Sequence, residues 1–164
     1  LTNFYMFVIK KYKFKKENNN KVEDSKLPVF TEKVDLKAKW TYSKKDELEG
    51  YDIGIKEGHK LMTNHMAQLY EILNKNNIKM SLAVYPWPHQ LSNDIENSHQ
   101  VTIWKKFCEN KCENFINYFP IFFNDMNNSS FLETYNKFYF KNDPHFNKSG
   151  HKVLAEKLIR IFNN

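Results

Sequence analysis

The 164-residue chain has few cysteines, a single arginine and no long apolar segment. No run approaches the roughly 20 apolar residues that a membrane-spanning helix needs, so no span is predicted. The longest N-terminal apolar run, Phe4–Ile9, is followed by lysines and lacks the cleavage-site features of a signal peptide.

The two cysteines, Cys108 and Cys112, are four residues apart. A helix would place both on one face, where a disulfide across a single turn is geometrically awkward. A zinc site would need further ligands at suitable spacing, and none is evident. The sequence therefore predicts two buried thiols, and the redox compartment stays open.

Aromatic residues and lysine are what the chain has in abundance. Hydrophobic residues make up 41% and aromatic residues 16%, which is enough for a packed core, and the formal net charge is +6. Lysine carries this charge, because Arg160 is the sole arginine. The run Lys10–Lys16 interleaves lysine with aromatics, as single-strand binders do. No nucleic-acid fold motif accompanies it, so we interpret the charge as a solvated surface and predict no nucleic-acid partner.

Residues 1–50 and 51–164 differ in organisation. The first segment is irregular or linker-like, with a helix expected over 1–16 and a polar loop over 17–26. The second alternates helices and strands. Its expected elements are an amphipathic helix Tyr51–Asn76 capped by Asp52 with a buried stripe, a strand 78–85, a helix 93–109, a strand 113–119 closed by Pro120, a loop 121–128, a short helix within 129–140 and a final helix 149–162.

This alternation favours an α/β fold with a parallel sheet covered on both faces, and Met80–Tyr85 is expected as a central strand. Ligands of such sheets bind beyond the carboxyl ends of the strands. The residues that follow the first strand are therefore predicted to bind substrate: Tyr85, Trp87, His89 and Gln90. Simple packing of Trp87 and a surface-loop position for His89 are the alternatives.

Asp143-Pro144-His145 is the motif that carries chemistry. Pro144 biases Asp143 towards an extended conformation, in which residues two apart point to the same side. The Asp143 carboxylate can then hold an imidazole nitrogen of His145, as the acid and base of a serine triad do. Asn147 or Ser149 can cap the last helix. A plain polar loop before a helix is the alternative.

A metal site is the rival interpretation of the same segment. Asp143, His145 and His151 offer suitable ligand types, but no fourth ligand is evident, so neither metal nor cofactor is predicted. His151 is expected to be a bystander in the first turn of the last helix.

Two motifs, Asp143-Pro144-His145-Phe146-Asn147 and Tyr85-Pro86-Trp87-Pro88, resemble the C-terminal part of the SGNH/GDSL hydrolase superfamily. The resemblance spans about 51–162 and is strongest to acyltransferase-like members with Asp-X-His. It implies a three-layer α/β/α, flavodoxin-like fold. It also implies a serine esterase or O-acyltransferase acting on acyl esters of small molecules or carbohydrates, with Asp143 as acid, His145 as base and Asn147 near substrate.

The nucleophile of such an enzyme is missing from this sequence. None of the eight serines follows Gly-Asp, and none of the four glycines lies in a matching block. We therefore expect a C-terminal part whose serine lies upstream of Leu1 and which is inactive alone. A degenerate relative, or a non-catalytic carbohydrate-binding domain using residues such as Trp40, Trp87 and Trp104, is the alternative. The sequence does not determine the oligomeric state or the location. A periplasmic or membrane-anchored full-length protein is one option.

Overall fold

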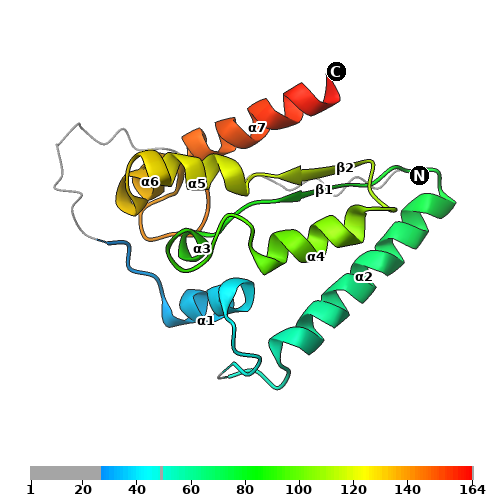
Figure 1. Cartoon of the computed structure of the whole chain (residues 1–164), viewed down its shortest axis with the longest axis horizontal. Helices are drawn as coiled ribbons and strands as arrows, with labels where there is room; N and C mark the ends of the chain where they lie inside the picture. Colours follow the sequence, from blue (N-terminus) through cyan, green and yellow to red (C-terminus); the bar gives the residue numbers. More distant parts are fainter. Residues whose placement is uncertain (1–26, 49, 164) are drawn as a thin grey trace, which may run out of the picture.

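The computed structural model describes residues 27–48 and 50–163 (Figure 1). The helix and loop expected within 1–26 lie outside the described residues. The described part of the chain is mostly helical with a small parallel sheet. This confirms the predicted α/β class. The elements in order are α1 Glu32–Tyr42, α2 Ile55–Lys75, β1 Ser81–Val84, α3 Pro88–Asn93, α4 His99–Cys108, β2 Asn114–Asn117, α5 Phe119–Asn128, α6 Phe131–Phe138 and α7 Lys148–Phe162.

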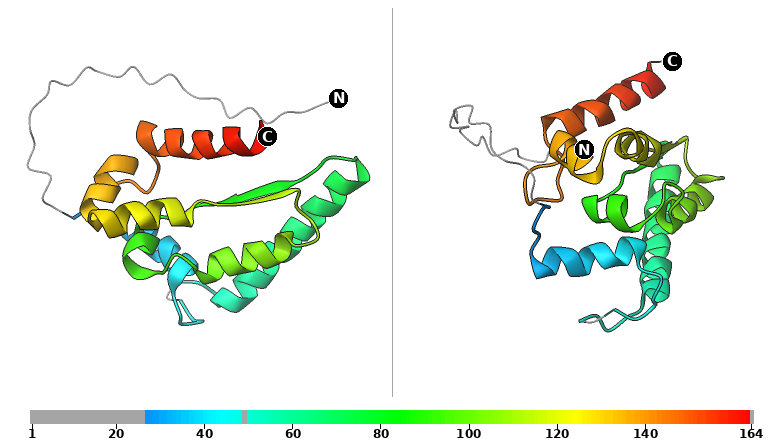
Figure 2. Two further views of the ribbon diagram at one scale, coloured as in Figure 1. Left: turned by 45° about the horizontal axis from the view of Figure 1, so that its top comes forward. Right: turned by 60° about the vertical axis from the view of Figure 1, so that its left-hand side comes forward.

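The sheet consists of β1 and β2, paired in parallel with Ser81 opposite Asn114 and Val84 opposite Asn117. Both predicted strands are present but shorter than expected. Figures 1 and 2 show α7 on one side of the sheet, α2 and α4 on the other, and α5 and α6 beyond the carboxyl ends of the strands. In the described part of the chain β1 pairs only with β2, so the expected central position of β1 is not seen there. Leu82 and Val84 are buried, whereas Ser81 and Ala83 are exposed.

Proline explains two differences between the predicted and observed helices. Pro88 lies in the first turn of α3, a helix that the sequence did not predict. The helix expected over 93–109 is α4, which begins six residues later, at His99. Pro120 lies in the first turn of α5, where a loop had been expected. Proline suits the first helical turn because its missing N–H would have no partner there. Each proline therefore ends an extended segment and also begins a helix.

Helix α2 is less buried than its sequence predicts. Only Ile55 is buried along its whole length, although Met62 and Met66 pack against the core. Leu69 is 43% exposed and Ile72 60% exposed. Of the predicted stripe, Met62, Met66 and Leu73 are partly buried and Leu69 is exposed, so the expectation of one buried stripe is met only in part.

The start of α2 is held by Asp46, and the predicted cap Asp52 does not make this contact. The Asp46 carboxylate accepts the Lys56 N–H at 2.8 Å, and its backbone carbonyl accepts the Ile55 N–H at 2.8 Å. At Gly58, any Cβ would lie 2.1 Å from the Trp40 ring. Glycine at this position therefore allows α1 to approach α2.

Aromatic rings fill the core around β2, α5 and α6. Phe119, Phe122 and Tyr135 are almost fully buried. Phe122 stacks on Phe146 with ring centroids 5.1 Å apart, and Tyr135 stacks on Tyr139 at 5.6 Å. These rings fix the segment between α6 and α7, which carries the Asp143-Pro144-His145 motif.

Cys108 and Cys112 form a disulfide, which corrects the expectation of two buried thiols. Helix α4 ends at Cys108, and the next residues turn so that the Cys112 N–H donates to the Cys108 carbonyl at 3.1 Å. Because Cys112 has left the helix, the Cα atoms come within 4.7 Å, inside the range that a disulfide permits. The sequence prediction assumed that both cysteines lie within one regular helix, where a disulfide is geometrically awkward.

None of the helices over 27–48 and 50–163 has the length and apolar character needed to cross a bilayer.

Candidate active site

A tight turn after α6 presents the Asp143-Pro144-His145 motif. The Phe140 N–H donates to the His145 carbonyl at 3.0 Å, and the Asp143 N–H donates to the Phe140 carbonyl at 3.1 Å. Asn142 has a φ of 55°, in the left-handed region that asparagine tolerates better than most residues. The turn therefore closes on itself and points Asp143 and His145 outward.

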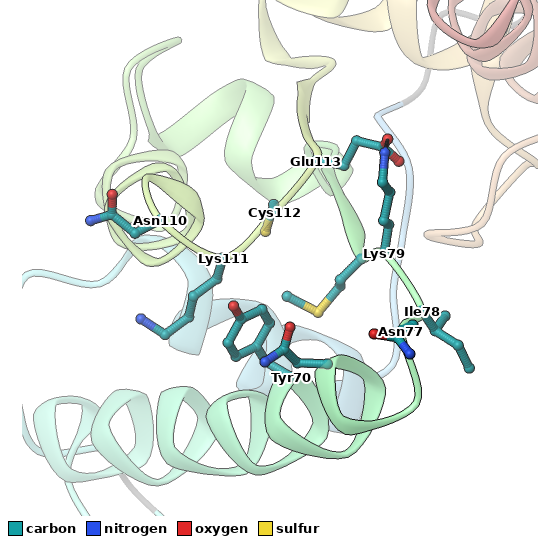
Figure 3. A pocket seen from close by; sticks show the side chains of 10 residues that line it. Tyr70, Asn77, Ile78, Lys79, Asn110, Lys111, Cys112 and Glu113 are labelled. Carbon is teal, nitrogen blue, oxygen red and sulfur yellow. Dashed lines mark hydrogen bonds and ion pairs between the residues drawn. The ribbon is translucent and has the colours of Figure 1, made fainter.

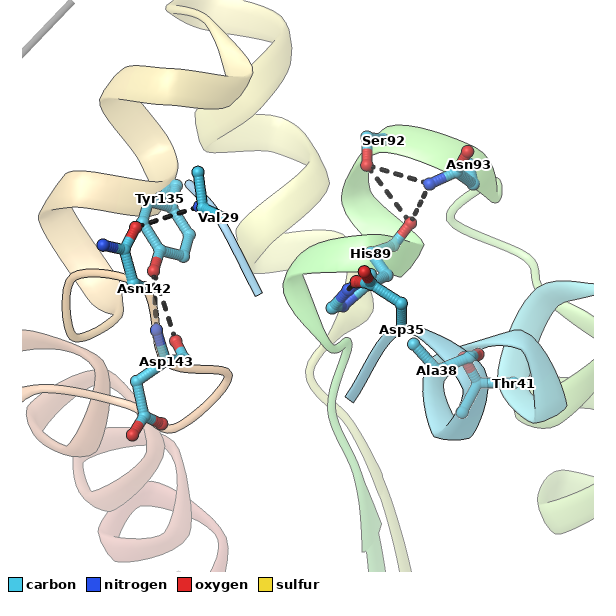
Figure 4. Close-up of polar contacts among 10 residues, drawn as sticks. All are labelled: Val29, Asp35, Ala38, Thr41, His89, Ser92, Asn93, Tyr135, Asn142 and Asp143. Carbon is cyan, nitrogen blue, oxygen red and sulfur yellow. Dashed lines mark hydrogen bonds and ion pairs between the residues drawn. The ribbon is translucent and has the colours of Figure 1, made fainter. Parts of the chain in front are cut away.

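The buried ring of Tyr135 anchors this turn through its hydroxyl group (Figure 4). Its hydroxyl donates to the Phe140 carbonyl at 2.5 Å and accepts the Asp143 N–H at 3.1 Å. Burial raises the pKa of Tyr135, so the hydroxyl stays protonated and can donate at neutral pH. The turn is thus fixed through its backbone, and the Asp143 carboxylate stays available.

Asp143 and His145 form the pair that the sequence predicts. The Asp143 Oδ1 lies 2.5 Å from the His145 Nδ1 and also accepts the His145 backbone N–H at 2.8 Å. The His145 side chain is 82% exposed. Among the described residues Nε2 has no hydrogen-bond partner. A carboxylate on Nδ1 favours the tautomer with its proton there, which leaves the Nε2 lone pair able to accept a proton.

Of the pair, His145 borders a small cavity of about 150 Å³. Its walls are His145, His151, Tyr85, Trp87, Pro144 and Phe146. Tyr85 and Trp87 follow the carboxyl end of β1, as the sequence predicts for a ligand site. The Tyr139 hydroxyl donates to the Pro86 carbonyl at 2.8 Å. This bond joins the end of β1 to the turn that carries Asp143-Pro144-His145, which we call the site turn. Burial raises the pKa of Tyr139 well above its usual value, so this donor is retained.

His89 and Gln90, both predicted to bind substrate, lie on α3 and away from this cavity. The His89 Nε2 is 2.8 Å from Asp35 Oδ1 on α1, and the ring packs against Phe30 with centroids 4.3 Å apart. Gln90 is fully buried; its Oε1 accepts the Trp87 N–H at 3.1 Å and its Nε2 donates to Gln100 at 3.0 Å. Both polar side chains are used in holding α3.

Asn147 caps α7 and does not line the cavity. Its Oδ1 accepts the N–H groups of Ser149 and Gly150, and its Nδ2 donates to the carbonyls of Lys137 and Tyr139. The predicted capping role is confirmed. Both polar atoms of the Asn147 amide are therefore used in these bonds. Asn147 could contact substrate, as the resemblance implies, only if one of them broke.

His151 is the cavity residue that the sequence interpretation set aside as a bystander. It lies in the first turn of α7, and its ring meets Phe146 edge-on at 6.2 Å. The dipeptide Gly150-His151 is the sequence feature that could have indicated this position. A Cβ on Gly150 would lie 2.4 Å from the Phe138 carbonyl, so α7 begins close against the site turn and carries His151 there.

The cavity lining contains no serine, threonine or cysteine from the described residues. Likewise, over 27–48 and 50–163 no group of three or more metal-ligating side chains could hold an ion. What this part of the chain provides is an oriented imidazole, a carboxylate and aromatic walls.

Comparison with known proteins returned no matching family model, no matching curated protein and no matching solved structure.

Proposed function

We propose that Asp143 and His145 are the acid and base of a serine-type esterase or O-acyltransferase that acts on acyl esters. The observation that carries this proposal is the 2.5 Å contact between Asp143 Oδ1 and His145 Nδ1. It leaves Nε2 open beside a cavity at the carboxyl end of a parallel strand. Hydrogen-bond contact between an oriented base and its supporting acid is the geometry that nucleophile activation requires.

The proton transfers follow from this arrangement. The His145 Nε2 takes the proton of a nucleophilic hydroxyl as its oxygen attacks the ester carbonyl. The imidazolium then returns the proton to the departing alkoxide as the ester C–O bond breaks. Water, or a hydroxyl of an acceptor, repeats the sequence and releases the acyl group. Asp143 stabilises the imidazolium in both halves.

In this proposal the hydroxyl nucleophile is not among the 164 residues. The proposed complete fold is the three-layer, flavodoxin-like arrangement of SGNH/GDSL hydrolases. Two observations support further elements packed against this part of the chain: Ser81 and Ala83 on one face of β1 are exposed, and Leu69 and Ile72 on α2 are exposed. In the proposed fold a helical layer covers that face of β1, and additional strands widen the sheet towards α2.

The cavity walls favour a short acyl group on a carbohydrate or other small alcohol. A volume of about 150 Å³ is below the range of pockets for drug-sized ligands, so it suits part of a substrate. Tyr85 is 45% exposed at its rim, where an aromatic ring can pack against the face of a sugar.

The test is ester turnover by the full natural chain, measured with 4-nitrophenyl acetate and with an acetylated xylo-oligosaccharide. We expect turnover that disappears in His145→Ala, while the isolated 164 residues stay inactive. Turnover that persists in His145→Ala, or its complete absence in the full natural chain with both substrates, would overturn the proposal. Turnover by the isolated residues would contradict the external origin of the nucleophile.

A further inference from the structure

A second hollow lies at the other end of β1, where the strand begins (Figure 3). It has a volume of about 510 Å³, within the usual range for ligand pockets. We call it the amino-end groove. Its walls are the last turns of α2, residues 77–80 that lead into β1, and residues 110–113 of the disulfide turn.

The walls of the amino-end groove are fixed before any ligand arrives. The disulfide from Cys108 to Cys112 pins one wall to the end of α4. On the opposite wall the Asn77 N–H donates to the Asn74 carbonyl at 3.0 Å, and the Ile78 N–H donates to the Leu73 carbonyl at 2.9 Å. Preorganised walls reduce the entropy that binding must overcome.

Three carboxamides line the groove, those of Asn74, Asn77 and Asn110. Within the described part of the chain none of the three side chains makes a hydrogen bond. Other asparagines are engaged, as Asn76 is with the Ile72 carbonyl at 2.7 Å. A carboxamide offers two donors and an acceptor, which is the combination that sugar hydroxyls satisfy as donors and acceptors at once.

An aromatic ring and a net positive charge complete the lining. Tyr70 lies on α2, and the Lys111 ammonium is 6.0 Å from its ring centroid. Lys79 is paired with Glu113 at 2.6 Å, so these two charges offset each other. Among the described residues Lys111 has no carboxylate partner. The lining therefore carries one uncompensated positive charge.

We propose that the amino-end groove binds an acidic sugar residue, with its hydroxyls on the carboxamides, its ring against Tyr70 and its carboxylate on Lys111. The groove is a binding subsite without chemistry, because the Asp143–His145 pair lies at the opposite end of β1. It would hold the chain on an acidic glycan. The inference is independent of the proposed acyl chemistry.

The experiment compares methyl β-D-glucuronide with its neutral counterpart methyl β-D-glucoside in ¹H–¹⁵N NMR titrations of the chain. We expect the glucuronide to shift the backbone amides of residues 77–80 and 110–113, with a Kd at least tenfold below that of the glucoside. Lys111→Gln should remove that preference, and Tyr70→Ala should weaken both ligands. Lys106→Gln, which removes a lysine of α4 outside the groove, is the matched control and should change nothing.

Equal binding of the two ligands, shifts outside the groove, or the same loss from Lys106→Gln as from Lys111→Gln would overturn the inference. Unfolding curves of each variant separate lost binding from lost structure. If Tyr70→Ala unfolds, Lys111→Gln still decides the outcome. Ester turnover plays no part in these measurements, so failure here leaves the proposed acyl chemistry untouched.

Discussion

Asp143–His145 and Asp35–His89 are the same two residue types at similar distances, yet their surroundings differ in almost every respect. Figure 4 shows the second pair and the Asp143 side chain of the first. In the first pair the carboxylate meets Nδ1, and the imidazole is 82% exposed. In the second the carboxylate meets Nε2 at 2.8 Å, and the imidazole is only 9% exposed. The Nδ1 of His89 is buried without a hydrogen-bond partner in the described part of the chain.

The difference is that only the Asp143–His145 contact leaves an imidazole nitrogen exposed and available for proton transfer. His145 keeps Nε2 open beside a cavity, so it can exchange a proton with a bound group. His89 uses Nε2 to join α3 to α1 and has its other nitrogen enclosed, so it can only hold structure. Exposure and the choice of nitrogen matter more than the distance.

Removing the two histidines should separate chemistry from structure most strongly. In the full natural chain, His145→Ala should lower ester turnover by about 10³-fold, the scale of a lost general base, with little change in thermal stability. His89→Ala should instead lower the free energy of unfolding and leave kcat of the folded fraction within a fewfold. Steady-state kinetics and thermal melts measure both. A reversal of the two effects would show that the roles are assigned the wrong way round.

Asp143→Asn should cost less than His145→Ala, since it changes the orientation of the base and leaves the base in place. We expect a loss of turnover roughly tenfold to a hundredfold smaller, seen in kcat more than in KM. Equal losses in the two variants would indicate that His145 cannot act at all without its carboxylate.

Asp35→Asn tests the structural pair. The Asp35 side chain is half exposed, so losing its charge should lower the free energy of unfolding by only about 1 kcal/mol. Urea denaturation of Asp35→Asn beside the parent chain measures this. Turnover in the full natural chain should not change. A loss of turnover in this variant, with the fold intact, would link α1 to the candidate active site.

A third histidine, His59, should make stability depend on pH. Burial lowers its pKa, and the neighbouring His99, at a ring separation of 5.1 Å, lowers it further. A lowered pKa means that the unfolded chain binds the proton more readily, so stability should fall as pH drops through about 6.5, the usual histidine value. Urea midpoints between pH 5 and 8 should follow this trend, and His59→Gln should flatten it. A slope that His59→Gln leaves unchanged would assign the effect elsewhere.

The smallest effect is expected from His151→Ala. His151 lines the cavity but contacts neither Asp143 nor His145 through a hydrogen bond, so about a twofold change in kcat/KM is the expectation, chiefly through KM. Loss of most turnover would give His151 the role that we assign to His145.

Local sequence was sufficient for the features that depend on neighbours in the chain. The Asp143-Pro144-His145 spacing gave the pairing because Pro144 restricts the backbone between the two side chains. The apolar runs gave β1 and β2, and Asn147 gave the start of α7. Each of these depends on residues only a few positions apart.

Features that depend on distant contacts could not be read in the same way. His89 and Gln90 follow a strand, as binding residues do, but α1 covers His89, and α1 lies in a segment with no clear pattern. The exposure of α2 depends on the width of the sheet. The disulfide depends on α4 ending at Cys108. Pro120 predicted the end of a strand, whereas it lies in the first turn of α5.

The central claim is that Asp143 contacts Nδ1 of His145, whereas Asp35 contacts Nε2 of His89, so the nitrogen without a carboxylate differs between the two rings. ¹⁵N NMR of the histidine rings tests this directly in the isolated chain. In the neutral rings we predict the proton on Nδ1 of His145, with an unprotonated Nε2, and the proton on Nε2 of His89. His145→Ala and His89→Ala assign the two sets of signals. A neutral His145 with its proton on Nε2 would contradict the account, because its free nitrogen could then accept no proton from a nucleophile.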